Sequence, residues 1–144
     1  MSDDWETPHD LFAKWNMLFL FTLDPCSTKD TAKCKKYYTV EDNGIFQSWK
    51  GERVFMNPPY SEIPTWVNKA VLEVEHNDCD LVFGLLPAWT DRIWFHELVY
   101  HRAKEIRFLQ GRVKFLLNGE SQGSPIFGSM VVIWENDKVF FVRQ

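Results

Sequence analysis

The chain lacks the features that mark membrane-spanning and secreted proteins. Its 144 residues include no apolar run long enough to cross a membrane, and the acidic start Met1-Ser2-Asp3-Asp4 does not match a signal peptide. Cysteine is scarce: Cys26, Cys34 and Cys79 are odd in number and do not have metal-binding spacing. We therefore expect a cytoplasmic protein without a membrane partner, whose cysteines are reduced thiols.

The histidines do not supply a metal site either. His96 and His101 are off a common helical face, and no glutamate lies between them at the spacing of zinc proteases. His9 and His76 stand alone in the sequence. We therefore expect that the protein binds no metal.

Internal repeats, low-complexity segments and linkers are also absent, which predicts a single domain over residues 1–144. Apolar residues make up 45% of the chain and seven residues are tryptophan, which excludes an intrinsically disordered protein. The formal net charge of −4 argues against tight binding of nucleic acid, whose phosphates call for a basic face. The basic residues do fall into two clusters, which leaves weak binding open; the alternative is a solvated surface. The clusters are Lys29, Lys33, Lys35 and Lys36, and Arg102, Lys104, Arg107, Arg112 and Lys114.

Apolar strands alternate with amphipathic helices along the chain. Helices are expected from Thr7-Pro8 to about Asn16, from Pro64, and from Thr90, with Thr7 and Thr90 as N-caps. Strands are expected at residues 18–23, 54–56, 81–86, 106–109 and 130–134, and a final hairpin from Asn136-Asp137 to residues 139–142. This order predicts an α/β fold with a mostly parallel sheet and an antiparallel C-terminal hairpin.

The most informative stretch is Asn57-Pro58-Pro59-Tyr60, which follows the predicted strand 54–56. Two prolines fix φ and remove two backbone donors, so the turn is rigid and its carbonyls are free to accept. Asn57 adds a side-chain acceptor and a donor. Tyr60 adds a flat face on which a base or an amide can stack.

Two acceptors beside a stacking plane suit a planar –NH₂ group, such as the exocyclic amine of adenine. This amine is a poor nucleophile because its lone pair is delocalised into the ring. Hydrogen bonds from its two N–H groups to Asn57 and to the Pro58 carbonyl would favour a pyramidal nitrogen, the geometry of a methyl-transfer transition state. The same four residues are also compatible with an ordinary proline turn followed by a packed tyrosine.

Three loops follow predicted strands: residues 24–26, 57–60 and 87–91. The carboxyl ends of parallel strands meet at one edge of a sheet, where ligands bind. We therefore expect these loops to surround one crevice.

Further short segments occur in order along the chain: Trp5-Glu6-Thr7-Pro8, Leu23-Asp24-Pro25-Cys26, Lys36-Tyr37-Tyr38-Thr39, Glu41-Asp42-Asn43-Gly44, Leu85-Leu86-Pro87-Ala88, Trp94-Phe95-His96 and residues 107–112. Together with Asn57–Tyr60, they make the chain similar to the compact phage-type DNA adenine-N6 methyltransferases. The resemblance implies a single Rossmann-like methyltransferase domain without a separate target-recognition domain. It also implies S-adenosylmethionine as cofactor, DNA as partner and, for a phage-encoded protein, the host cytoplasm as location.

The resemblance further implies roles for individual residues. The catalytic residues are Asn57, Pro58, Pro59 and Tyr60. The residues expected to bind the cofactor are Trp5, Thr7, Pro8, Asp24, Pro25, Cys26 and Asp42. Candidate contacts to DNA phosphates are Arg92, Arg112 and Lys114. Thr7-Pro8 also reads as a helix start, and Asp24-Pro25 as the plain end of a strand.

The chain departs from the family pattern after Leu23, where no Gly-x-Gly loop follows. The interval from Asp24 to Asn57 has room for about one βαβ unit, whereas a full cofactor domain would place two further strands there. Either the segment 37–49 supplies an abbreviated version, or cofactor affinity is poor. Trp89 and Gly128 also stand where the resemblance leads us to expect polar or proline residues.

We therefore expect in-line methyl transfer to adenine in DNA, with the base flipped out of a duplex or already single-stranded. Two alternatives stay open. The acceptor could be another planar amine: cytosine, an RNA base or a glutamine amide. The fold could also be a degenerate methyltransferase that binds DNA or protein without turnover. A homodimer stays open as well, because the surplus of aromatic residues would suit an interface.

Overall fold

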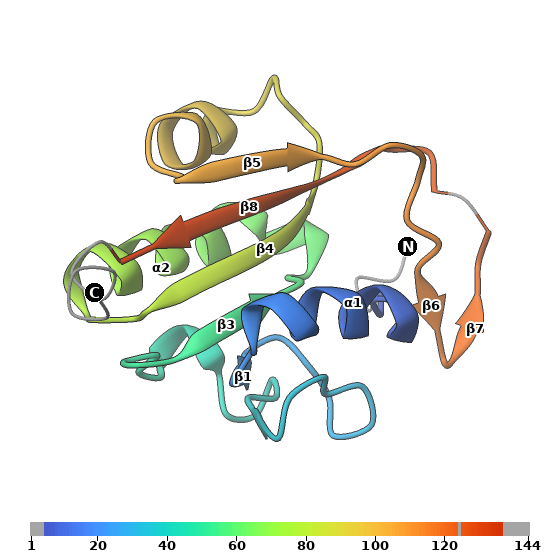
Figure 1. The fold of residues 1–144 in the computed structure, drawn as a ribbon, viewed down its shortest axis with the longest axis horizontal. Coiled ribbons are helices and arrows are strands. Elements are labelled where there is room, and N and C mark those ends of the chain that lie inside the picture. Colours follow the sequence, from blue (N-terminus) through green and yellow to red (C-terminus); the bar gives the residue numbers. More distant parts are fainter. Residues whose placement is uncertain (1–4, 124, 137–144) are drawn as a thin grey trace.

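A six-stranded sheet forms the centre of the computed structural model, which describes residues 5–123 and 125–136 (Figure 1). Its strands, in spatial order, are β2 (Lys36–Tyr37), β1 (Leu23–Asp24), β3 (Arg53–Met56), β4 (Leu81–Pro87), β8 (Ser129–Glu135) and β5 (Glu105–Phe108). The first four are parallel, and β8 is antiparallel to both of its neighbours. The predicted α/β fold with a mostly parallel sheet is therefore confirmed.

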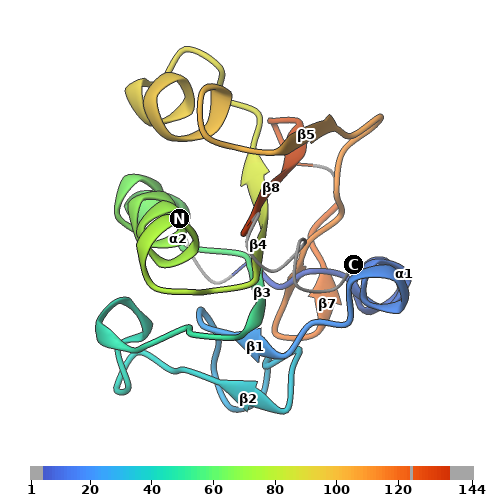
Figure 2. The ribbon, with the colours of Figure 1, turned by 60° about the vertical axis from the view of Figure 1, so that its left-hand side comes forward.

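Helices cover both faces of the sheet, as Figure 2 shows edge-on. Helix α1 (His9–Phe19) lies on one face, together with a hairpin of β6 (Leu116–Leu117) and β7 (Glu120–Ser121). Helix α2 (Ile63–His76) and the short π-helix η3 (Phe95–Tyr100) lie on the other. In the described part of the chain, no helix is both long enough and apolar enough to cross a membrane.

Side chains of the central strands alternate between two cores. On β4, Val82 and Leu86 join the cluster under α2, while Phe83 and Leu85 join the cluster under α1. The α1 cluster is built largely of aromatic rings: Phe12, Trp15, Phe21, Phe55, Phe83 and Phe115. Many of the aromatic residues are thus part of the interior.

Most predicted elements are confirmed, and the regions around Leu18 and Thr7 are not. The run Leu18–Leu23 is not one strand, because α1 continues to Phe19 and only Leu23–Asp24 pairs in the sheet. Leu18 and Leu20 are 72% and 66% exposed, and Leu20 ends the helix in a left-handed conformation with φ 52°. Residues 18 and 19 are helical rather than extended because the buried face of α1, including Phe12 and Trp15, packs on the aromatic core.

The predicted helix starts at Thr7 and Thr90 also differ from the structure. Helix α1 begins at His9 with Pro8 at the N-cap position, and no side chain caps it. No side-chain cap is formed at η3 either. The segments β2, β6 and β7 were not predicted, since two-residue strands leave no periodic signal. The hairpin predicted at the C-terminus lies outside the described residues beyond Asn136; the described antiparallel hairpin is β6–β7.

Candidate active site

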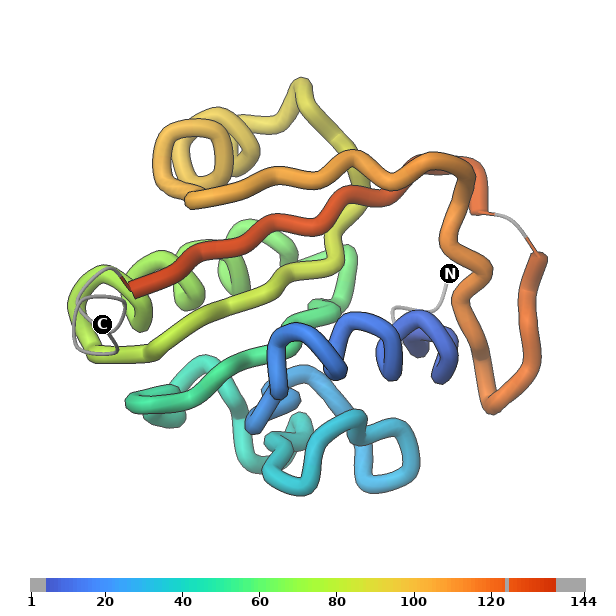
Figure 3. The backbone as a smooth tube through the Cα atoms, in the orientation of Figure 1, coloured from blue at the N-terminus to red at the C-terminus, as the bar shows by residue number. Residues whose placement is uncertain are grey.

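Three loops meet at the carboxyl edge of the parallel strands, as predicted. Asp24 ends β1, Asn57 follows β3, and Ala88 follows β4, and these three strands are parallel neighbours. The segment before α1 joins them, because the side chain of Asn57 donates to the Trp5 carbonyl. The same segment is tied to the hairpin, because Glu6 forms two backbone hydrogen bonds with Leu116 of β6, at 2.9 and 2.8 Å. Figure 3 shows the start of α1 beside the hairpin.

The side chain of Asn57 is held by that segment and leaves one atom unused. Its Nδ2 donates to the Trp5 carbonyl at 2.6 Å and to Thr7 Oγ1 at 3.2 Å. Its Oδ1 is buried and has no hydrogen-bond partner among the described residues. The Trp5 carbonyl can only accept, so it fixes which end of the amide carries the donors. Asn57 therefore presents a buried acceptor with nothing bound to it.

The two prolines lead the chain from β3 into α2. Pro58 is buried, and Pro59 has φ −57°, which starts a 3₁₀ turn over Tyr60–Glu62 directly before α2. The Pro59 carbonyl accepts the Glu62 N–H at 3.0 Å. Asn57 is thus followed by a turn that proline and helix geometry hold in place.

Tyr60 lies in a cluster of aromatic rings, which we call the aromatic wall: Tyr60, Trp89, Phe115 and Phe127. The three other rings stand steeply to Tyr60, with centroids 6.1, 6.2 and 5.4 Å away. Its hydroxyl is buried without a partner in the part of the chain that the structure describes, and burial raises the pKa of Tyr60. Tyr60 therefore remains a neutral phenol at ordinary pH.

Asp24 organises the loop after β1. Its carboxylate accepts the Cys26 N–H at 3.3 Å with Oδ1 and the Lys33 N–H at 3.0 Å with Oδ2. Burial raises the pKa of Asp24 from 3.8 to about 6, and the two N–H groups oppose that rise. Burial also raises the pKa of the Cys26 thiol, so Cys26 stays protonated. Pro25 packs against Gly44 so closely that a Cβ there would lie 2.6 Å from the Pro25 carbonyl oxygen.

A buried ion pair joins this loop to the segment before α1. Lys33 Nζ lies 2.9 Å from Glu6 Oε2, and the two side chains are only 7% and 9% exposed. Lys33 also donates to His9 Nδ1 at 3.0 Å. Sequence reasoning grouped Lys33 with the surface cations and missed this role, because its partner lies 27 positions away.

The carboxylate of Asp42 is bonded within the turn that contains it. It is exposed, and its Oδ2 accepts the N–H and the hydroxyl of Thr39 at 2.9 and 3.1 Å, within its own turn. The interval between β1 and β3 contains a single short strand, β2, rather than two. The missing Gly-x-Gly loop is replaced by an irregular segment in which the Ser27 hydroxyl is buried without a partner among residues 5–123 and 125–136.

The three predicted phosphate contacts are exposed, and they differ in their surroundings. The guanidinium of Arg92 lies 4.7 Å from the centre of the Trp89 ring, next to the aromatic wall. Arg112 donates to the Pro125 carbonyl at 2.6 Å, and Lys114 lies two residues further along the segment that leads to β6. Arg92 thus contacts a ring, Trp89, that packs against Tyr60.

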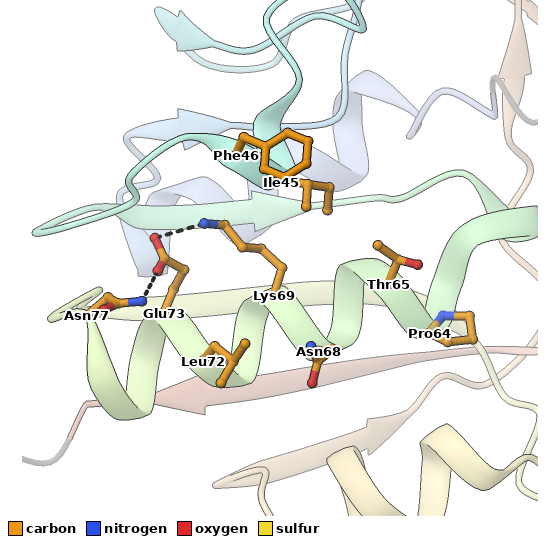
Figure 4. Close-up of a pocket in the computed structure, with 9 residues that line it drawn as sticks. All are labelled: Ile45, Phe46, Pro64, Thr65, Asn68, Lys69, Leu72, Glu73 and Asn77. Atoms are coloured by element: carbon orange, nitrogen blue, oxygen red, sulfur yellow. Dashed lines mark hydrogen bonds and ion pairs between the residues drawn. The ribbon is translucent and has the colours of Figure 1, made fainter.

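A separate groove lies along the flank of α2 (Figure 4). Ile45 and Phe46 form one wall and α2 the other. Lys69 pairs with Glu73 at 3.2 Å, and Asn77 donates to the same carboxylate. These polar groups bond one another, so the described residues of the groove include no buried, unpartnered acceptor comparable to Asn57 Oδ1.

Two further features of the site were missed from the sequence. Ser129, at the start of β8, is opposite Pro87 and 1% exposed, and its hydroxyl has no partner among the described residues. Phe115 and Phe127 complete the aromatic wall. A serine before an apolar strand gives no signal in one sequence, and the contacts of these phenylalanines join distant segments. No group of three or more metal-ligating side chains lies together in the described ranges.

Known proteins resemble this chain over nearly its whole length. The model of the family described as DNA N-6-adenine-methyltransferase (Dam) matches residues 1–140. A protein of Escherichia phage T1 named DNA N-6-adenine-methyltransferase is 28% identical over 148 aligned positions, which cover 87% of this chain and 61% of the relative. One of the same name from Haemophilus phage HP1 is 32% identical over 139 positions, covering 92% and 79%. The chain thus spans about three fifths of the length of the phage T1 relative.

Proposed function

Because the chain belongs to the DNA N-6-adenine-methyltransferase (Dam) family, we propose that it transfers a methyl group from S-adenosylmethionine to the exocyclic amine of adenine in DNA. The observation that carries this proposal is the buried Asn57 Oδ1, which has no partner among the described residues. A buried acceptor without a donor costs about 1–3 kcal/mol. A ligand that brings an N–H group to this oxygen removes that cost.

The exocyclic amine of adenine has the donors that this oxygen needs. One N–H donates to Asn57 Oδ1, and the Pro58 carbonyl takes the other. Both bonds favour a pyramidal nitrogen, whose lone pair is then free to attack, so they strengthen toward the transition state. The reaction needs alignment more than a strong base, because the methyl donor is already electrophilic.

The base must leave the helix to reach Asn57, or be single-stranded already. We propose that it contacts the aromatic wall, with Tyr60 as the ring next to the amine, since aromatic rings hold bases of any sequence by stacking.

The residues around the edge fit S-adenosylmethionine. Its sulfonium is a cation, and the nearby carboxyl of Asp24 has a pKa of about 6 and is mostly ionised at neutral pH. The unpartnered hydroxyl of Ser27 can bond a polar group of the cofactor. When bound, the cofactor supplies an electrophilic methyl carbon. We propose that Trp5, Pro8, the loop Asp24–Cys26 and Asp42 line it.

DNA binding is proposed to be weak and salt-sensitive. Arg92, Arg112 and Lys114 are exposed cations on the segments around the wall, and each phosphate contact releases counterions. The net charge of −4 leaves little attraction beyond these contacts.

The test is transfer of labelled methyl from S-adenosylmethionine to unmethylated DNA, followed by digestion and base analysis. Label in N6-methyladenine alone supports the proposal. Label in cytosine, in RNA or in a glutamine amide of added protein redirects it to another planar amine. Cofactor binding without any transfer, or no cofactor binding, leaves a degenerate fold that binds without turnover.

A further inference from the structure

We propose that Thr7 and the Trp5 carbonyl are positioning groups that set the orientation of the Asn57 amide and thereby aim Oδ1 at the reacting amine. The inference rests on the proposed function for its catalytic meaning. It differs from the role that the sequence suggested for Thr7, which was contact with the cofactor. Thr7 is 1% exposed, so its hydroxyl faces the protein interior rather than solvent.

The geometry around Nδ2 carries the argument. An asparagine amide rotates about a broad, roughly two-fold torsion, so its two ends exchange readily unless their partners differ. Here the partners do differ. The Trp5 carbonyl, 2.6 Å from Nδ2, has no proton to give, and the Thr7 hydroxyl accepts the second N–H at 3.2 Å. Both donors are used, and Oδ1 must point away from them.

A flipped Asn57 amide could not accept a hydrogen bond from the adenine amine. It would turn an –NH₂ group toward the –NH₂ group of adenine, and two donors cannot bond one another. It would also place Oδ1 against the Trp5 carbonyl. The hydrogen bond to Thr7 thus matters for the acceptor at the opposite end of the amide.

The segment Trp5–Thr7 is itself held by contacts with two other parts of the chain. Between Trp5 and Thr7, Glu6 pairs through its backbone with Leu116 of the hairpin at 2.9 and 2.8 Å. Its carboxylate holds Lys33 of the loop after β1 at 2.9 Å, with both side chains nearly buried. The segment therefore links the hairpin, the candidate cofactor loop and Asn57, and it gives Trp5 and Thr7 a fixed place from which to hold the amide.

The test compares Thr7→Val, which keeps the shape and removes the acceptor, with Thr7→Ser, which keeps the hydroxyl. The exposed Thr65 of α2 provides a matched control, Thr65→Val. Three quantities are measured: the single-turnover rate of methyl transfer, the calorimetric affinity for S-adenosylmethionine, and the hydrogen exchange of the Asn57 side-chain –NH₂ by NMR in the ligand-free protein.

We expect Thr7→Val to slow transfer by about 5- to 10-fold, as for loss of one neutral hydrogen bond, with cofactor affinity changed less than about 2-fold. Its Asn57 –NH₂ should exchange faster than in the wild type. Thr7→Ser should restore both the rate and the protection. An unchanged rate and exchange in Thr7→Val, or a loss confined to cofactor affinity, would overturn the inference.

The exchange measurement separates this inference from the proposed function. A wild-type protein that methylates no adenine, yet loses Asn57 protection in Thr7→Val, would reject the proposed function and retain the positioning role. A protein that methylates adenine while the Asn57 –NH₂ exchanges freely in the wild type would retain the proposed function and reject the positioning role.

Discussion

Asp24 and Asn57 end neighbouring parallel strands at the same edge of the sheet, and their oxygens are used in opposite ways. Both Asp24 oxygens accept backbone N–H groups, from Cys26 and Lys33, and so shape the loop that follows. Asn57 bonds through its nitrogen alone, and its buried oxygen has no partner among the described residues. The first side chain uses both oxygens within its own loop, while the second has a buried oxygen to which none of the described residues donates.

This difference separates an acceptor that the fold itself uses, at Asp24, from one that it leaves open, at Asn57. A buried acceptor that the fold satisfies contributes to stability, and its replacement should be felt in unfolding experiments. A buried acceptor that the fold leaves open costs stability and is retained for a ligand, so its replacement should be felt in turnover. The predictions below test this division.

The largest expected effect is that of Asn57→Asp, which keeps an acceptor oxygen and removes the donors. A carboxylate would put an oxygen where Nδ2 now lies, 2.6 Å from the Trp5 carbonyl, and the two would repel. We expect single-turnover methyl transfer to fall by about 10²–10³, as for loss of an aligned polar contact to a transition state. A variant with the wild-type rate would show that an acceptor alone suffices and that the donors of Asn57 are not needed.

Asp24→Asn should change how stability depends on pH. The pKa of Asp24 is raised to about 6 in the folded protein, above its ordinary 3.8, so the folded state binds this proton more tightly. Its contribution to stability is complete below about pH 4 and is lost as the pH rises through about 6, by at most about 3 kcal/mol. Denaturant unfolding at pH 4 to 7 should therefore give a flatter profile for the variant. Parallel profiles would mean that Asp24 ionises normally.

Gly44→Ala should loosen the loop after β1. The added Cβ would lie 2.6 Å from the Pro25 carbonyl oxygen and 3.2 Å from the Trp66 ring, and such overpacking costs about 1–3 kcal/mol. Gly128 is the matched control, since a Cβ there meets nothing within 4 Å. Denaturant midpoints of Gly44→Ala and Gly128→Ala should differ accordingly; equal midpoints would show that the loop yields without cost.

Ser129→Ala is expected to have the smallest effect on stability. Its buried hydroxyl has no partner in the described ranges, so removing it should leave the free energy of unfolding unchanged or raise it by up to about 1 kcal/mol. Thermal unfolding measures this directly. A clear destabilisation would mean that the Ser129 hydroxyl stabilises the fold. A loss of turnover at unchanged stability would place it with Asn57.

Most of the strands and helices could be predicted from the sequence, because the patterns that indicate them are local. Breakers after short apolar runs marked the ends of β3 and β4, and the 3.6-residue period marked the buried face of α2. Parallel strands then brought the three loops to one edge without any further information. Asn57 itself was predicted from its rigid turn and its amide chemistry.

The contacts that complete the site could not be predicted, since each joins segments far apart in the chain. The Trp5 carbonyl and Asn57 are separated by 52 positions, and Glu6 and Lys33 by 27. Thr7 reads locally as a helix cap, but in the structure its hydroxyl bonds Asn57. The run Leu18–Leu23 reads locally as a strand, yet burial of Phe12 and Trp15 extends the helix instead.

The most direct test of the central claim, that Asn57 Oδ1 accepts a hydrogen bond from the amine being methylated, is the single-turnover rate of Asn57→Ala with DNA and labelled S-adenosylmethionine. The exposed Asn68 of α2 supplies the control, Asn68→Ala. We predict that Asn57→Ala forms N6-methyladenine about 10²–10³ times more slowly than the wild type, with cofactor affinity unchanged, and that Asn68→Ala keeps the wild-type rate. Near wild-type transfer by Asn57→Ala would contradict the account.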